Sequence, residues 1–254
     1  MQGQRLLPIA INVGKLMLEC GAEIYRVEES IIRICKAYGA KSVEVFAIPS
    51  SIIVTLNMDG DEFITLSKRV FVKETDLDKM DKLNGLSRLI CSSYPEADEI
   101  EEKIDEIMNS KVYNQPIILL AYAITPATFC FFFGGNLKDA ASALIIGIII
   151  KFTLDGLIRF NANVIFTNII CSAVGSIFAI LCVRIGIADN HDKIIIGTIM
   201  LLVPGLILTN SMRSFMMGDL MAGMLLLIEA LLVAIGIAIG VALILTIFGV
   251  NTFS

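Results

Sequence analysis

The residues of this chain that could bind a polar ligand lie in a stretch otherwise suited to lipid. In the last third, an apolar run is interrupted by Pro204-Gly205, Thr209-Asn210 and Arg213. Proline and glycine at membrane depth break a helix and free carbonyl and amide groups, which a polar solute or ion uses in place of water. We therefore predict a solute-binding site at these five residues. An ordinary helix kink is the alternative.

Charged residues inside apolar segments form a second set of candidates, because a charge in lipid requires a partner or a function. Lys151, Asp155 and Arg159 recur every four residues and share one helix face, so that an acid lies between two bases. A structural ion pair and a transport role both fit this spacing. Asp219 and the isolated Glu229 could take and release a proton, although Glu229 could also be a protonated hydrogen-bond donor. Lys151, Asp155, Asp219 and Glu229 are thus predicted as proton-coupling or ion-pair residues.

Five apolar segments must position these side chains. The chain has 254 residues, of which 56% are hydrophobic and only 18% charged, and most of its charges precede Lys111. About 20 apolar residues in a helix cross the hydrocarbon layer of a membrane. Residues 112–254 are therefore predicted to form an all-α bundle of five transmembrane helices: Pro116–Phe133, Ala140–Ile158, Val164–Val183, Ile194–Thr209 and Ala222–Phe248.

Residues 1–111 have the composition of a small soluble α+β domain that begins with a helix. Apolar residues recur at steps of three and four from Leu6 to Tyr38, which predicts one long amphipathic helix that stops at Gly39. Gly14 and Gly21 are expected to mark a kink or close packing. The opposite face, which includes Glu23, Arg26 and Arg33, is interpreted as a solvated face of ion pairs.

A sheet and two helices are expected to complete this domain. Strands at Ser42–Ile48, Ser51–Asn57 and Glu62–Val70 predict a three-stranded antiparallel sheet, whose last two strands form a hairpin through residues 58–61. Thr75 is predicted to cap a helix that runs to about Ser92, and Pro95 to lie in the first turn of another.

Several classes of function lack the residues that they need. The formal net charge of −5, with no basic stripe, argues against a nucleic-acid partner. Six scattered cysteines and a single histidine predict reduced, structural thiols and no metal site, and no cofactor is expected. No phosphate-binding loop or Ser/His/Asp set is present, so we predict no catalytic residues and no enzyme. Without a signal peptide, the first domain is expected to stay in the cytosol.

Short motifs from both ends of the chain carry a resemblance to a known family. The first begins at Gly21-Ala22-Glu23, has Arg26-Val27-Glu28 at its centre and ends at Gly39. The others are Ala47-Ile48-Pro49, Pro204-Gly205, Thr209-Asn210, Gly218-Asp219 and Glu229-Ala230. With these motifs the chain resembles the bacterial threonine/serine exporter (ThrE) family over nearly its whole length.

This resemblance implies secondary, ion-coupled export of small polar metabolites across the bacterial plasma membrane. Threonine and serine are the substrates of the best-known members, and C4-dicarboxylates such as succinate are those of related split systems. Full-length members have about ten spans, so the chain looks like the larger half of a split exporter that works with a small integral-membrane partner. The odd number of predicted spans also implies such a partner.

Two other functions remain open from the residues alone. A membrane-anchored sensor would bind a small molecule through residues 1–110. An intramembrane aspartyl protease would use Asp155 and Asp219, since two carboxylates can share one proton, although its motifs are incomplete.

Overall fold

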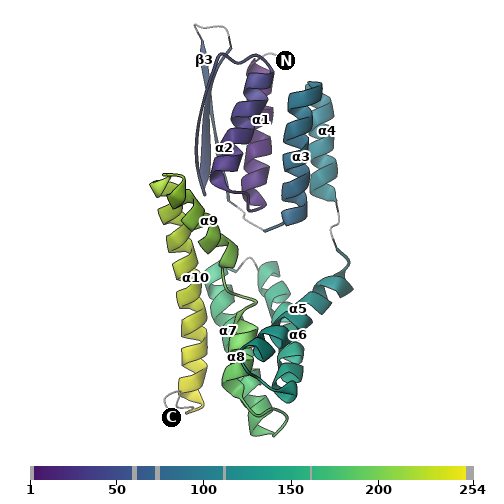
Figure 1. The fold of residues 1–254 in the computed structure, drawn as a ribbon, viewed down its shortest axis with the longest axis vertical. Coiled ribbons are helices and arrows are strands. Elements are labelled where there is room, and N and C mark those ends of the chain that lie inside the picture. The colour runs from purple at the N-terminus through teal and green to yellow at the C-terminus, as the bar shows by residue number, and fades with distance from the viewer. Residues whose placement is uncertain (1–2, 59–61, 72–74, 111–112, 161, 250–254) are drawn as a thin grey trace. The chain divides into compact units, whose positions relative to one another are not determined.

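The computed structural model describes residues 3–58, 62–71, 75–110, 113–160 and 162–249 (Figure 1). The chain divides into two compact units. The first unit consists of Met1–Val112 together with Leu208–Leu227, and the second of Tyr113–Ile207 together with Ile228–Ser254. A short segment from the last third of the chain therefore packs with the N-terminal residues.

The first unit contains the expected three-stranded sheet with helices on one side. Helices α1 and α2 cover a face of the antiparallel sheet β1-β2-β3, and α3 and α4 pack beyond them (Figure 1). The elements are α1 (Gly3–Glu19), α2 (Ile24–Ala37), β1 (Ser42–Ile48), β2 (Ser51–Asn57), β3 (Phe63–Arg69), α3 (Leu77–Ser93) and α4 (Ala97–Asn109).

The prediction of a single long helix from Leu6 to Tyr38 is wrong. Gly21 adopts φ +91°, the amide of Ala22 donates to the carbonyl of Met17 and that of Gly21 to Leu18. These two bonds form a Schellman motif, which ends α1 and lets α2 fold back against it. The apolar periodicity runs through the break because both helices bury their apolar faces in the same hydrophobic core. The close packing expected at Gly14 is confirmed, because a Cβ there would lie 2.5 Å from Ile31 Cδ1.

The sheet agrees with the sequence almost residue by residue. Buried Ile52, Val54 and Leu56 alternate along β2 and face the helices, as expected for a sheet with one covered face. Thr55 pairs with Thr65 across the β2–β3 hairpin, and their hydroxyls lie 3.0 Å apart. The hairpin is confirmed, whereas its turn at 59–61 lies outside the described residues.

The stop at Gly39 is confirmed, and two helix starts are displaced: α4 begins at Ala97 with Glu96 as its cap, so Pro95 precedes the first turn. The amide of Ala40 donates to Cys35 beyond a Gly39 at φ +91°, a second Schellman motif. The cap of α3 is Asp76 rather than Thr75, because the Asp76 carboxylate accepts from the Lys79 amide at 3.0 Å.

The second unit is built from apolar helices. They are α5 (Gln115–Phe132), α6 (Leu137–Arg159), α7 (Val164–Arg184), α8 (His191–Ile199) and the larger part of α10 (Leu220–Ile247). Four helices of the described chain, α5, α6, α7 and α10, are long and apolar enough to cross a membrane. Five membrane-spanning helices are not confirmed, because the fourth predicted span is interrupted. The nine residues of α8 reach only about 14 Å at 1.5 Å per residue.

Small residues allow the helices of the second unit to approach closely. A Cβ on Gly147 of α6 would lie 2.1 Å from the Tyr122 carbonyl oxygen of α5, and one on Gly197 of α8 would lie 2.6 Å from that of Pro126. Gly240 of α10, four residues after Gly236, meets Ser172 and Ile169 of α7 in the same way. Glycines of this kind are typical of helix packing in lipid, where backbone proximity replaces the hydrophobic effect.

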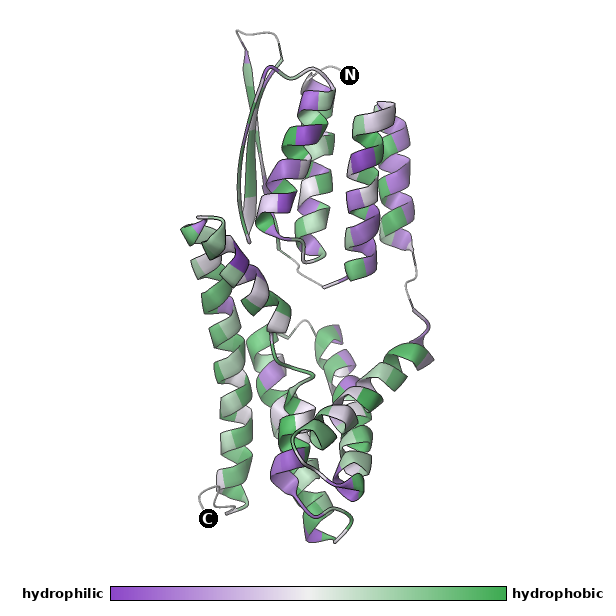
Figure 2. Ribbon diagram, viewed as in Figure 1, coloured by the Kyte–Doolittle hydropathy of each residue, from purple (hydrophilic) through white to green (hydrophobic). Residues whose placement is uncertain are grey.

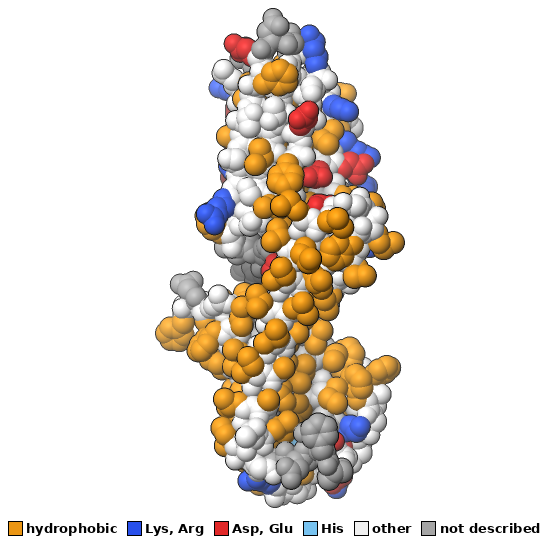
Figure 3. Space-filling view, turned by 90° about the vertical axis from the view of Figure 1, so that its left-hand side faces the viewer, with side chains coloured by type: hydrophobic (Ala, Val, Ile, Leu, Met, Phe, Trp, Pro, Cys, Tyr) orange, Lys and Arg blue, Asp and Glu red, His pale blue; other side chains and the backbone are white. Residues whose placement is uncertain are grey.

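The surfaces of the two units differ in polarity. Polar residues are interspersed along the helices of the first unit, whereas the helices of the second unit consist largely of hydrophobic residues (Figure 2). Large apolar side chains are exposed along α10, among them Leu231, Ile235 and Ile239, and hydrophobic atoms dominate the surface of the second unit in Figure 3. This apolar surface is that of a membrane protein.

Candidate functional site

The helix break predicted at Pro204-Gly205 is present. Helix α8 ends at Ile199, and α9 (Gly205–Met216) begins directly after Pro204. Between them the chain turns, with the amides of Leu202 and Val203 both donating to the Ile199 carbonyl. Pro204 has no amide hydrogen, so it cannot continue α8 and suits the position before a new helix. The sequence therefore identified a true interruption and not a kink.

Helix α9 meets the start of α2 through a charge cluster. Arg213 forms an ion pair with Oε1 of Glu23, the residue that precedes α2. The other carboxylate oxygen, Oε2, lies 2.5 Å from Nε of Arg26. The Glu23 carboxylate is thus held between two guanidinium groups, one from each end of the sequence. It is only 18% exposed, whereas Arg213 is 40% exposed, so the arginine remains open to a further anion.

Further polar contacts fix α9 in the first unit. Asn210 donates to the Gly21 carbonyl at 3.4 Å, a group in the turn between α1 and α2. Ser211, which is fully buried, donates to the Gly223 carbonyl at 2.8 Å. Asp219 caps α10 by accepting from the Ala222 amide at 3.0 Å, and Ala222 is part of the hydrophobic core of this unit.

Two carboxylates of the first unit interact electrostatically. Glu28 of α2 accepts a hydrogen bond from the Ala47 amide at 2.9 Å. Burial raises the pKa of Glu28, the Ala47 hydrogen bond opposes this, and the charge of Asp219 raises the pKa further. A carboxyl group with a raised pKa next to a second carboxylate holds its proton at a higher pH than an ordinary glutamate does. In the sequence, only its place in the first motif marked Glu28.

Replacing Glu28 should flatten the dependence of stability on pH. The pKa of Glu28 is higher in the folded protein than its ordinary value of 4.5, so binding of this proton stabilises the fold. This stabilisation is lost as pH rises from about 4.5 through the raised pKa. Glu28→Gln keeps an acceptor for Ala47 but removes the titration. We expect its thermal midpoint in detergent to fall less between pH 4.5 and 8 than that of the wild type. Exposed Glu44→Gln is the control, and an unchanged slope for Glu28→Gln would contradict the assignment.

The charges of α6 form a local pair. Lys151 Nζ lies 2.5 Å from Asp155 Oδ1 and 5.2 Å from the ring centre of Tyr122 on α5. Among the described residues, Arg159 makes no ion pair with Asp155. Lys151 and Asp155 therefore neutralise each other, with the cation also over an aromatic face. Glu229 lies on α10 within the second unit.

The predicted site residues are divided between the units. Thr209, Asn210, Arg213 and Asp219 belong to the first unit, where Arg213 and Asn210 contact the α1–α2 turn. Pro204, Gly205, Lys151, Asp155 and Glu229 belong to the second unit. The structure thus assembles a charged site around Arg213, a predicted solute-binding residue, and Glu23, which local periodicity had placed on a solvated face.

Asp139 is a polar residue that the sequence interpretation missed. It is fully buried at the start of α6, and its Oδ1 accepts from the amides of Asp189 and Asn190 at 2.8 and 2.9 Å. Its Oδ2 accepts from the Asn136 amide and the Asn190 side chain. The carboxylate joins the start of α6 to the loop before α8. The capping box formed by Asn136 and Asp139 was the available sequence signal.

Asp139→Asn should destabilise the second unit. In Asp139→Asn an NH2 group replaces one carboxylate oxygen, so a donor faces N–H groups that are themselves donors. Each charge-assisted hydrogen bond lost in this way is worth about 2 kcal/mol. We expect a lower thermal midpoint and less monodisperse protein in size-exclusion chromatography. Asp192→Asn, at an exposed position of α8, is the matched control. Equal midpoints for the two variants would show that the Asp139 network contributes nothing.

Comparisons with known proteins agree with the resemblance of the motifs. The chain matches the ThrE family, the threonine/serine exporters, over residues 8–248. It is also similar to a threonine/serine exporter of Corynebacterium glutamicum, with 25% identity over 221 residues. That match covers 84% of this chain but 45% of the relative, so the chain spans less than half the relative's length. No solved structure matches the chain. Since the family match covers nearly all of the sequence, the chain belongs to the threonine/serine exporter family.

Proposed function

We propose that the chain is one subunit of a secondary active exporter in the bacterial plasma membrane, with residues 1–111 in the cytosol. Its substrates are small polar metabolites, namely threonine and serine or C4-dicarboxylates such as succinate. The observation that carries this proposal is the ion pair between Arg213 and Glu23. It ties the segment predicted to bind the solute to the first motif of the family.

Arg213 binds the substrate carboxylate by exchanging partners. Guanidinium groups prefer carboxylates and bind them in a bidentate manner. Glu23 retains Arg26 as a second cation, so its charge stays compensated when Arg213 turns to a substrate. Asn210 and Thr209, on the same helix, supply polar groups beside it. Substrate and Glu23 thus compete for one arginine, which couples substrate binding to the packing of α9 on the α1–α2 turn.

Proton coupling uses the carboxylates of the first unit. Burial raises the pKa of Glu28, and the charge of Asp219 raises it further, so Glu28 is suited to take up a proton. Lys151, Asp155 and Glu229 are the corresponding candidates in the second unit. In this mechanism the Lys151–Asp155 pair stabilises α6 or opens during transport.

A small membrane subunit completes the transporter. The chain spans 45% of its relative, and four of its described helices are long enough to cross a membrane. Exporters built from repeats need a second half. Asp155 is paired with Lys151 and Asp219 caps a helix, so no observation favours the intramembrane aspartyl protease.

Reconstitution tests the proposal directly. Proteoliposomes with the chain alone, and with its small partner, are loaded with labelled threonine, serine or succinate and subjected to a pH gradient. We expect gradient-dependent efflux of at least one substrate in the two-subunit preparation. Its absence for all three substrates in both preparations would refute the proposal.

A further inference from the structure

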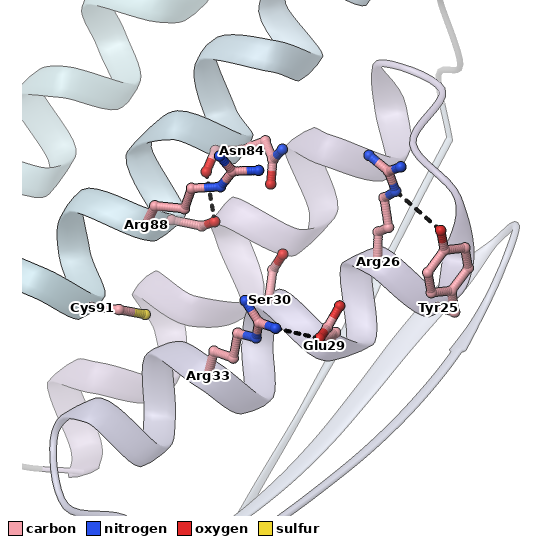
Figure 4. Close-up of a pocket in the computed structure, with 9 residues that line it drawn as sticks. Tyr25, Arg26, Glu29, Ser30, Arg33, Asn84, Arg88 and Cys91 are labelled. Carbon is pink, nitrogen blue, oxygen red and sulfur yellow. Dashed lines mark hydrogen bonds and ion pairs between the residues drawn. The ribbon is translucent and has the colours of Figure 1, made fainter.

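A polar cavity of about 490 Å³ lies between α2 and α3 in the first unit. Its size is that of a site for a small molecule. The side chains that matter here are three arginines, Arg26, Arg33 and Arg88, together with Ser30, Asn84 and Tyr25 (Figure 4). None of the residues that line it belongs to α9, and the cavity shares with the Arg213 site only Arg26, the second cation on Glu23.

The cavity is strongly cationic in an acidic protein. Its lining contains three guanidinium groups and a single carboxylate, Glu29, whereas the whole chain has a formal net charge of −5. Glu29 is already used, because its Oε1 lies 2.6 Å from Nη2 of Arg33. Arg26 pairs with Glu23 outside the cavity. Within the described part of the chain, Arg88 has no ion-pair partner. A cavity lined by several positive charges attracts anions, because their electrostatic potentials add.

The polar groups around the arginines suit a ligand with several anionic oxygens. Ser30 is a largely buried residue on α2, and Asn84 lies one turn before Arg88 on α3. In Figure 4 these side chains surround a common space with the arginines. Hydroxyl and amide groups donate to oxygens that guanidinium forks leave unpaired. An ammonium group, in contrast, finds only Glu29, which is engaged by Arg33.

We propose that this cavity binds a small dianion that carries carboxylate or phosphate groups, with Arg88 and Arg33 as its main partners. The ligand joins α2 to α3 by neutralising charges on both. A zwitterionic amino acid binds much more weakly, since its ammonium group meets cations. This site is additional to the proposed transport site and does not depend on it.

Calorimetry on the purified full-length chain in detergent tests the proposal, with succinate, inorganic phosphate and threonine titrated separately. We expect succinate or phosphate to bind at least tenfold more tightly than threonine, and the tighter of the two identifies the chemistry of the ligand. Arg88→Gln should weaken this binding at least tenfold, and Arg88→Lys, which keeps the charge but loses the fork, by less. Arg69→Gln, an exposed arginine on β3, is the matched control and should bind as the wild type.

Three outcomes would overturn the inference. The first is that neither succinate nor phosphate binds the wild type. The second is that threonine binds as tightly as both of them. The third is that Arg88→Gln binds the dianion as tightly as the wild type while its thermal midpoint shows it to be folded. Arg213→Gln separates this site from the proposed transport site. Loss of dianion binding in Arg213→Gln but not in Arg88→Gln would place the ligand at Arg213, which would leave the proposed function standing and this inference refuted.

Discussion

Arg213→Gln should reduce the export of substrate at least tenfold. The change removes the guanidinium group that pairs with Glu23 and that we propose to bind the substrate carboxylate, and a hydrogen bond between charged groups at a binding site is worth about 1.5–3 kcal/mol. Because Arg26 still compensates Glu23, the variant should fold. Initial rates of efflux from proteoliposomes, with chromatographic profiles as a check of folding, provide the measurement.

Matched variants separate this effect from a general loss of charge. Glu99→Gln breaks an exposed pair with Lys103 on α4, and export should stay at the wild-type rate. Glu23→Gln frees Arg213, so substrate should bind more tightly while turnover falls. Full export by Arg213→Gln, in protein shown to be folded, would exclude the partner-exchange mechanism.

Gly147→Leu should prevent the second unit from folding properly. Even the first carbon of a side chain at this position would lie 2.1 Å from the Tyr122 carbonyl oxygen of α5. Backbone atoms cannot rotate away as side chains do, so α5 and α6 must separate. Overpacking costs about 1–3 kcal/mol and more where, as here, the contact is with backbone. We expect loss of monodisperse protein in fluorescence-detected size-exclusion chromatography.

The same helix offers its own control. Gly156 is also in α6, but no atom lies within 4 Å of a Cβ built there. Gly156→Leu should therefore leave yield and thermal midpoint unchanged or slightly raised, since leucine is a better helix former than glycine. If both leucine variants behave alike, close packing at Gly147 is not what holds α5 against α6.

Local sequence determined the elements whose causes are local. Strands β1 and β2 begin and end at the predicted residues, because alternating apolar residues specify both a strand and its buried face. Gly39 and Pro204 end helices as predicted, since left-handed backbone and a missing amide act within a few residues. The apolar segments and the family motifs likewise needed no tertiary information.

Tertiary structure decided what depends on distant partners. Gly21 was expected to mark a kink or close packing, whereas in the fold α1 stops there and α2 packs back against it. Glu23 and Arg213, at opposite ends of the chain, each had a plausible local role, on a solvated face or beside a helix break. Only the fold shows them as a pair. The reason is physical. A charged side chain that is buried on folding needs a partner of opposite charge or a hydrogen bond, but which residue provides it depends on the folded chain.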